Sequence, residues 1–275
     1  MHITLTGNLG SGKSTIAKIM AEKFGYTIYS TGKIQRELAE ERGLTVLEMN
    51  KLMQTDHSFD NIIDEKVTQL SKESKEELFF DSRLAWHFAE NAFKVFLSVS
   101  IDEAARRVYN DDKRGDVEKY TSIEDAKANL IERAHTEDIR YKDIYALDYF
   151  NLNNYDLVLD STFSKPELLA EVLINEKKRY EEFLVENGLP TTFDKNKKSA
   201  KELAGKDIEI RSRILLAPAR LLGSSEGNTR DNDEIYDSTA VVRSGAEDIE
   251  VVSGLDQIEK AAREGYEFVS VIYER

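Results

Sequence analysis

The glycine-rich segment at residues 7–14 is the stretch whose residue types and spacing point most directly to chemistry. It reads Gly7-Asn8-Leu9-Gly10-Ser11-Gly12-Lys13-Ser14. This is the spacing of a Walker A loop, in which glycines allow consecutive backbone N–H groups to point at a phosphate chain. We expect Lys13 to reach the β- and γ-phosphates of a nucleoside triphosphate, and the Ser14 hydroxyl to ligate Mg²⁺. The residues expected to bind the triphosphate are Gly7, Asn8, Gly10, Ser11, Gly12, Lys13, Ser14 and Thr15.

The residues on either side of this segment provide the setting that such a loop needs. The apolar run Ile3-Thr4-Leu5 precedes it and predicts a strand, and the amphipathic stretch from Thr15 to Met20 predicts a helix. A glycine-rich turn without a ligand is the alternative interpretation. The order of strand, loop and helix favours the phosphate site.

The charge balance of the chain directs attention to its arginines. Lys and Arg number 38 against 52 Asp and Glu, which gives a formal charge of −14. This acidity disfavours a large nucleic-acid-binding surface, because nucleic-acid phosphates would be repelled. A phosphorylated substrate is also an anion, so its site must gather positive charge locally.

A first candidate for such a site follows the β-like run Tyr26–Tyr29. Residues 30–36 predict a polar turn that opens a helix. The segment resembles the one that holds the acceptor nucleotide in nucleoside monophosphate kinases. That resemblance implies a pocket lined by Thr31 and the backbone at Gly32, with the acceptor phosphate held by Arg36. The alternative is a helix N-cap with a solvent-facing arginine.

A second candidate lies at the end of a buried-strand pattern at residues 77–83. Asp81 and Arg83 follow the apolar residues there, where an open α/β sheet places its ligands. We expect Asp81 to act on Mg²⁺ through water or on the acceptor, and Arg83 to hold the acceptor phosphate. An equally weighted alternative for Asp81 is a cap on a helix that begins near Leu84.

A third candidate is the pair Arg133 and Arg140 on a helix predicted from about residue 123. Seven residues apart, they share one helix face beside a charged segment, residues 111–122. This arrangement suits a lid that stabilises the transferring group. The alternative is surface ion pairing, with partners Glu132, Glu137 and Asp138.

Alternation of strand and helix patterns predicts the fold class. We expect an α/β domain with a doubly wound parallel sheet of about five strands, a helical acceptor cover within residues 37–75, and a lid. This P-loop domain spans residues 1–188. A polar, lysine-rich linker at residues 189–206 leads to a small α+β domain at residues 207–275.

The composition argues against several protein classes. The sequence contains no apolar run of about 18 residues or more, so a membrane span is not expected. A strand begins within the first residues, which leaves no room for a signal peptide. With no cysteine the chain has no disulfides or thiolate metal sites, and this fits a cytoplasmic protein.

Taken together, the motifs resemble the archaeal-type cytidylate kinase family over roughly the first 185 residues. The residues that carry the resemblance are the loop at 7–15, the turn at 30–36 with residues 39–44, residues 81–84, Arg133, and residues 140–145 and 155–158. The resemblance implies Mg·ATP-dependent phosphoryl transfer to CMP or dCMP, with Lys13, Arg133 and Arg140 as catalytic residues. The implied acceptor-binding residues are Thr31, Gly32, Arg36, Asp81 and Arg83, and the implied metal ligands are Ser14 and Asp81.

The C-terminal segment requires a separate explanation. Its ending weakly resembles the ParB/sulfiredoxin-like fold, in which a turn between a strand and a helix forms a nucleotide or partner site. Here Leu255-Asp256-Gln257 follow Gly254, where that motif has histidine and arginine. The segment is acidic, which disfavours DNA binding. A role in self-association or in a protein contact is the more economical interpretation.

Three functions therefore stay open. The first is a cytidylate-type monophosphate kinase. The second is a P-loop kinase for another small acceptor. The third is a regulatory ATP-binding protein with little catalysis, which the presence of Lys13, Ser14, Asp81 and four candidate arginines disfavours.

Overall fold

The fold is taken from a computed structural model that describes residues 1–44, 58–111, 120–189, 191, 212–227, 234–245 and 248–274. The chain divides into two compact units. The first consists of Met1–Thr6, Ser14–Val95 and Asn175–Ile210, and the second of Gly7–Lys13, Phe96–Ile174 and Arg211–Arg275. Strand β4 (Ala92–Ser98) and helix α8 (Pro166–Glu186) contribute residues to both units.

Parallel strands form the centre of the first unit. β1 (His2–Gly7), β2 (Thr27–Ser30) and β3 (Leu78–Asp81) lie in the order β2-β3-β1, with the start of β4 next to β1. In the β1–β3 pairing Leu5 is the partner of Asp81, and in the β2–β3 pairing Ser30 is its partner. Ile3, Leu5 and Phe79 are fully buried, as expected for strands covered on both faces.

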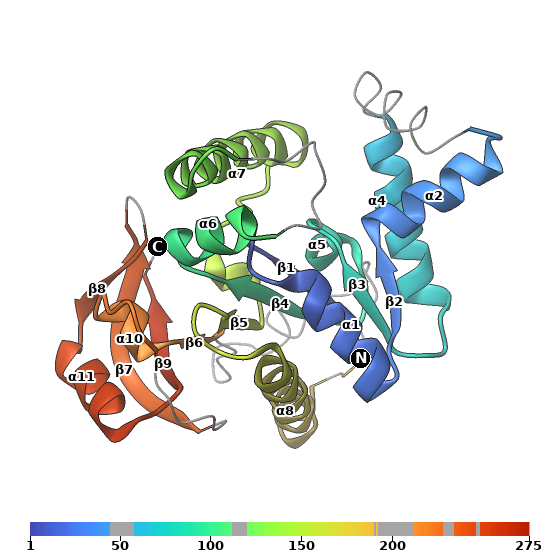
Figure 1. Cartoon of the computed structure of the whole chain (residues 1–275). Coiled ribbons are helices and arrows are strands. Elements are labelled where there is room, and N and C mark those ends of the chain that lie inside the picture. The colour runs from blue at the N-terminus through green and yellow to red at the C-terminus, as the bar shows by residue number, and fades with distance from the viewer. Residues whose placement is uncertain are drawn as a thin grey trace. The chain divides into compact units, whose positions relative to one another are not determined.

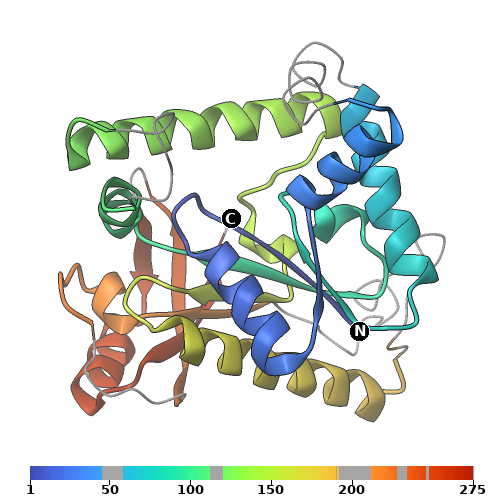
Figure 2. The same ribbon diagram turned by 45° about the vertical axis from the view of Figure 1, so that its right-hand side comes forward.

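Helices of the first unit pack on these strands. α1 (Lys13–Phe24) follows the loop, α2 (Thr31–Glu41) begins directly after β2, and α4 (Ser58–Glu73) packs against α2. A short helix, α5 (Ala85–Phe88), follows β3. One apolar cluster joins Ile34 of α2, Val67 of α4 and Phe80 of β3, and Figures 1 and 2 show the two helices side by side. The helical cover thus packs on β3, the strand that ends at Asp81.

The second unit contains a mixed sheet. Its strands are the end of β4, then β5 (Leu157–Asp160), β6 (Arg213–Leu216), β9 (Phe268–Tyr273), β7 (Ile235–Ser244) and β8 (Ile249–Ser253), in that spatial order. β6 is parallel to β5 and antiparallel to β9, β7 is parallel to β9, and β8 is antiparallel to β7. Strands from the C-terminal segment therefore continue the sheet from β5.

The helices of the second unit include the long one that carries two candidate arginines. α6 (Ile101–Tyr109) and α7 (Ile123–Tyr145) pack together, and α7 is foreshortened in Figure 1 and seen lengthwise in Figure 2. A 3-10 turn (Leu152–Asn154) precedes β5. The C-terminal segment adds α10 (Pro218–Leu221) and α11 (Leu255–Glu264), which ends at Gly265 in the left-handed conformation.

The predicted α/β class with a parallel sheet is confirmed, and two element boundaries were wrong. The residue pattern from Ile101 to Arg114 predicts a helix, but α6 ends at Tyr109, because the Asn110 amide donates to Arg106 O at 2.8 Å and caps it. The apolar residues from Ala240 predict the start of a strand there, but β7 begins at Ile235, where pairing with Phe268 extends it.

Some sequence predictions fall outside the described residues. They are the helix at 45–54, most of the charged segment at 111–122 and of the linker at 189–206, and a strand at 208–210. The boundaries 1–188, 189–206 and 207–275 stay a prediction. Within the described ranges, no helix has the length and apolar character to span a membrane.

The neutral form of His2 is built into the first unit. Its Nε2 lies 2.9 Å from Ser71 O, and its Nδ1 accepts the Leu78 N–H at 2.9 Å. Burial lowers the pKa of His2 below its ordinary 6.5, although the bond to Ser71 O opposes the shift. A second proton would break the bond from Leu78.

We therefore expect the free energy of unfolding to be fully present above pH 6.5 and to decrease as the pH falls below it, because the unfolded chain binds the proton more readily. Urea unfolding midpoints measured from pH 7.5 downward test this. His2→Asn, which keeps an acceptor for Leu78, should flatten the decrease. His135→Asn on the exposed surface is the control, and equal slopes for wild type and His2→Asn would contradict the assignment.

Candidate active site

Two glycines of the phosphate loop are required by close backbone approach. Gly7 has φ +144°, and a Cβ there would lie 2.1 Å from Leu97 O of β4. Gly10 has φ +76°, and its Cβ would lie 3.0 Å from Ala104 O of α6. Any larger residue would push the loop off the strand and helix behind it.

A tyrosine that the sequence analysis did not single out holds the first residue of the loop. Tyr149 is 1% exposed, its hydroxyl donates to Gly7 O at 3.1 Å, and the same oxygen accepts Gly7 N–H at 3.3 Å. Tyr155 in turn donates to Tyr149 O at 2.7 Å. Gly7 and Tyr149 are 142 residues apart in the sequence, which explains why no local pattern revealed this contact.

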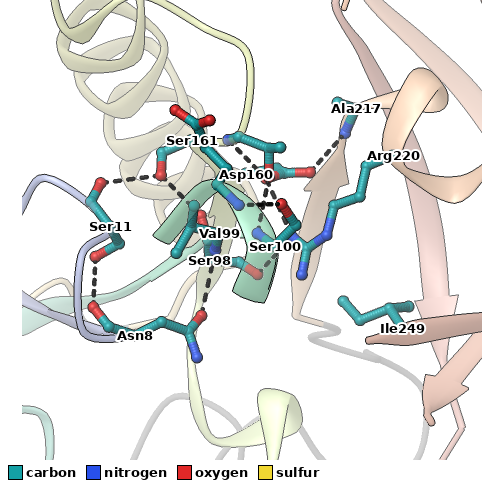
Figure 3. Close-up of polar contacts among 12 residues, drawn as sticks. Asn8, Ser11, Ser98, Val99, Ser100, Asp160, Ser161, Ala217, Arg220 and Ile249 are labelled. Carbon is teal, nitrogen blue, oxygen red and sulfur yellow. Dashed lines mark hydrogen bonds and ion pairs between the residues drawn. The ribbon is translucent and has the colours of Figure 1, made fainter. Parts of the chain in front are cut away.

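The middle of the loop is held by the ends of β4 and β5. Asn8 N donates to Leu97 O at 3.1 Å, and Asn8 Oδ1 accepts Val99 N–H at 3.2 Å. Ser11 is buried, its hydroxyl donates to Asn8 O at 2.8 Å, and Ser161 Oγ lies 2.9 Å from Ser11 O (Figure 3). The side chains of Asn8 and Ser11 thus shape the loop, and its shape leaves other backbone N–H groups for a phosphate.

The Lys13 ammonium bonds back to earlier residues of the loop. Its Nζ donates to Asn8 O at 2.7 Å and to Gly7 O at 3.1 Å, and lies 3.4 Å from Ser11 Oγ. The positive charge therefore lies against a loop rich in peptide N–H groups, and this combination favours an anion there. Gly12, Ser14 and Thr15 are exposed at the start of α1.

The loop is also tied to the helix that carries Arg133 and Arg140. Leu9 packs against an apolar cluster formed by α6 and α7, with Ala104 of α6 and Leu130 of α7 among its buried members. Both arginines lie on α7 as predicted, Arg133 half-buried and Arg140 exposed. Of their expected surface partners, Asp138 forms an ion pair with Lys142 at 2.7 Å. A movement of α7 would therefore also displace Leu9.

In the first unit, the predicted acceptor residues lie at the carboxyl ends of strands. Asp81 ends β3 and is level with Leu5 and Ser30, and Thr31 opens α2 directly after Ser30. α5 has Leu84 as its N-cap and no side-chain cap bond, so Asp81 does not cap it. The register thus brings Asp81 beside the start of α2, and the capping alternative is wrong.

The structure gives less detail for the other acceptor candidates, Arg83, Gly32 and Arg36. Arg83 is half-buried, and its carbonyl accepts the Thr6 hydroxyl at 3.1 Å, which fixes the chain after β3. Gly32 and Arg36 lie in α2, and the structure does not describe the surroundings of either residue. Roles in substrate binding for these residues stay predictions.

The donor set fits Mg²⁺ bound mainly by substrate. Among the described residues there is no group of three or more His, Cys, Asp or Glu side chains that could form a protein cage for a metal. Mg²⁺ keeps several waters and is usually bound by one or two protein oxygens together with phosphates. The Ser14 hydroxyl and the Asp81 carboxylate are oxygen donors of this kind.

Comparison with known proteins agrees with this loop and its setting. A model of the cytidylate kinase-like family matches residues 2–163 of the chain. The chain belongs to this family. A cytidylate kinase of Haloarcula marismortui is 36% identical over 182 residues, which cover 66% of this chain and 91% of that protein. A cytidylate kinase of Methanobrevibacter smithii is 32% identical over 178 residues, covering 65% of this chain and 99% of that protein.

A solved shikimate kinase from Bacteroides thetaiotaomicron is a more distant match. It is 16% identical, covers 67% of this chain and 98% of its own, and superposes with a TM-score of 0.45. This likeness is too remote to bear on the substrate. The family match ends at residue 163, so it does not extend to β6 and the elements that follow.

The hydroxyl of Tyr149 provides a test of how the loop is held. In Tyr149→Phe both polar groups of Gly7 lose a partner, so we expect the affinity for Mg·ATP to fall about fivefold, equivalent to about 1 kcal/mol. Isothermal titration with the nucleotide measures this. Tyr155→Phe is the matched control, because its hydroxyl is equally buried but contacts Tyr149 O and not the loop. Equal affinities for Tyr149→Phe and wild type would contradict the role of this hydroxyl.

Proposed function

We propose that this protein transfers the γ-phosphoryl group of ATP to CMP or dCMP. The observation that carries the proposal is the phosphate loop with Lys13 over it, in a chain of the cytidylate kinase-like family. The relatives from Haloarcula and Methanobrevibacter are named cytidylate kinases, and their alignment with this chain covers nearly their whole length. The base of the acceptor is assigned from these relatives.

The proposed mechanism needs little covalent chemistry from the protein. The N–H groups of the loop and Lys13 hold the β- and γ-phosphates of the donor. We assign the acceptor phosphate to Arg36 and Arg83, with Thr31 and Gly32 lining the acceptor pocket, and the charge of the transferring group to Arg133 and Arg140. Rate acceleration comes from alignment of the two substrates and from compensation of negative charge.

Magnesium supplies the remaining compensation when it is bound with ATP. Ser14 and Asp81 are the residues that we assign to it, with Asp81 acting on Mg²⁺ through water or else on the acceptor. The absence of cysteine from all 275 residues fits a reducing compartment, and we place the protein in the cytoplasm.

A P-loop kinase for a different small acceptor is the second candidate function. The phosphate loop is common to both candidates, and the acceptor residues lie partly outside the described side chains. A regulatory ATP-binding protein is a third possibility, for which the C-terminal strands next to β5 are the relevant feature.

A coupled assay of ADP release separates these functions. We expect turnover with Mg·ATP to be confined to CMP and dCMP among CMP, dCMP, UMP, AMP, GMP and shikimate. Turnover on another acceptor would support the second function instead. Tight ATP binding without turnover would support the third.

Lys13 should be indispensable to this turnover. We expect Lys13→Ala to abolish activity, because the charge on the transferring phosphate loses its nearest fixed cation. The fold should persist, since Lys13 is only half-buried and its Nζ bonds go to the loop itself. Circular dichroism of the variant is the control for folding. Near-wild-type turnover by a folded Lys13→Ala variant would contradict the proposed mechanism.

A further inference from the structure

A buried arginine from the C-terminal segment enters the region behind the phosphate loop. The Arg220 side chain, on α10, is 5% exposed. Its NH1 donates to Asp160 Oδ1 at 3.0 Å and to Ser98 Oγ at 2.9 Å, and its Nε donates to both oxygens of Asp248 at 3.1 Å. One guanidinium thus joins the ends of β4 and β5 to Asp248, the residue directly before β8. Figure 3 shows Arg220 beside Asp160.

Two of the residues that Arg220 holds, Ser98 and Asp160, are adjacent in sequence to residues that bond to the loop, Leu97, Val99 and Ser161. Asp160 is fully buried and accepts the Thr162 N–H at 3.0 Å and the Thr162 hydroxyl at 2.6 Å. Its other oxygen accepts the Ala217 N–H at 3.1 Å, which adds a second tie to the C-terminal segment. Asp160 therefore fixes the conformation of the residues directly after β5.

From there two hydrogen bonds reach the loop. The Ser161 hydroxyl lies 2.9 Å from both Ser98 O and Ser11 O, and Ser161 N donates to Ser98 O at 2.8 Å. Arg107 of α6 also donates to Ser11 O, at 3.4 Å, and to Thr162 O at 3.2 Å. The path from Arg220 to Ser11 is thus Arg220, Ser98, Ser161 and Ser11, with Asp160 fixing the backbone beside it.

The charged groups around Arg220 depend on one another, so its removal would leave a buried charge uncompensated. Burial alone would disfavour the guanidinium cation, but the carboxylates of Asp160 and Asp248 outweigh it and raise the pKa of Arg220. Asp160 has no other cation among its described contacts, so removal of Arg220 leaves a buried carboxylate without a counter-charge. Residues 160–162 are then the nearest part of the structure that can rearrange.

We propose that Arg220 is a positioning residue through which the C-terminal segment holds the phosphate loop in its binding conformation. The effect on ATP rests on the proposed function, whereas the effect on the loop itself does not. Arg220 is not in contact with the loop, so it acts through Ser98, Asp160 and Ser161. The C-terminal segment is in this view a part of the nucleotide site rather than an appendage to it.

The test uses the full chain with four variants. Arg220→Gln removes the positive charge, and Asp160→Asn combined with Arg220→Gln removes both buried charges, so that the only carboxylate of the group left is that of the part-exposed Asp248. Asp248→Asn weakens the hold on Arg220 from the solvent side, where Asp248 is 33% exposed. Arg243→Gln is the matched control, since Arg243 pairs with Glu250 at 3.2 Å on the exposed surface of the same segment.

Two measurements are made at a temperature at which circular dichroism shows every variant to be folded. The first is hydrogen exchange of the backbone amides in residues 7–13 without nucleotide. The second is the dissociation constant for Mg·ATP, with the KM for CMP as comparison.

We expect Arg220→Gln to speed exchange in residues 7–13 and to weaken Mg·ATP binding about tenfold, as for the loss of a hydrogen bond to a charged group, with the KM for CMP unchanged. Asp248→Asn should fall between this variant and wild type, and the double variant should fold but bind ATP weakly. Arg243→Gln should match wild type.

Unchanged exchange in the loop of folded Arg220→Gln and double variants would overturn the proposal. Faster exchange spread evenly over the chain, with ATP and CMP affected alike, would also overturn it, because Arg220 would then stabilise the fold without positioning the loop. A wild-type protein that shows no ATP binding would contradict the proposed function alone. The exchange measurement would still decide the role of Arg220.

Discussion

A phosphate-binding loop must keep its N–H groups unpaired on one side, so it has to be held from the other. In this protein nearly every contact that shapes the loop comes from behind it. The Tyr149 hydroxyl forms hydrogen bonds with both the N–H and the C=O of Gly7. Residues at the ends of β4 and β5 bond to Asn8 and Ser11, and the backbone of α6 lies close to Gly10. The rest of the second unit can be understood as the support that this arrangement requires.

The sequence predicted the parts of this arrangement that depend on local chain geometry. The loop follows β1 and opens α1, Arg133 and Arg140 lie on one helix, and Asp81 ends a buried strand. Each of these predictions used a spacing of a few residues, which fixes position on a strand or helix by itself. The same kind of local pattern, a glycine followed by an amphipathic stretch, predicts a helix from Leu255, where α11 begins.

The sequence did not reveal contacts between distant residues. Tyr149 and Gly7 are 142 residues apart, and Arg220 and Asp160 are 60 apart, with no periodic pattern connecting them. The early end of α6 at Tyr109 depended on one amide side chain that caps it. For the same reason the sequence suggested a C-terminal domain of its own and did not indicate that β6 would pair with β5.

That pairing has a consequence for how short the protein can be. In the second unit β6 covers the side of β5 that faces away from β4, along Leu157, Val158 and Leu159. All three residues are fully buried, and the strand ends in Asp160, whose carboxylate accepts the N–H of Ala217 directly after β6. A version of this chain that stopped after α8 would leave these three residues without their β6 partners. The edge of β5 would then be open to pairing with another chain.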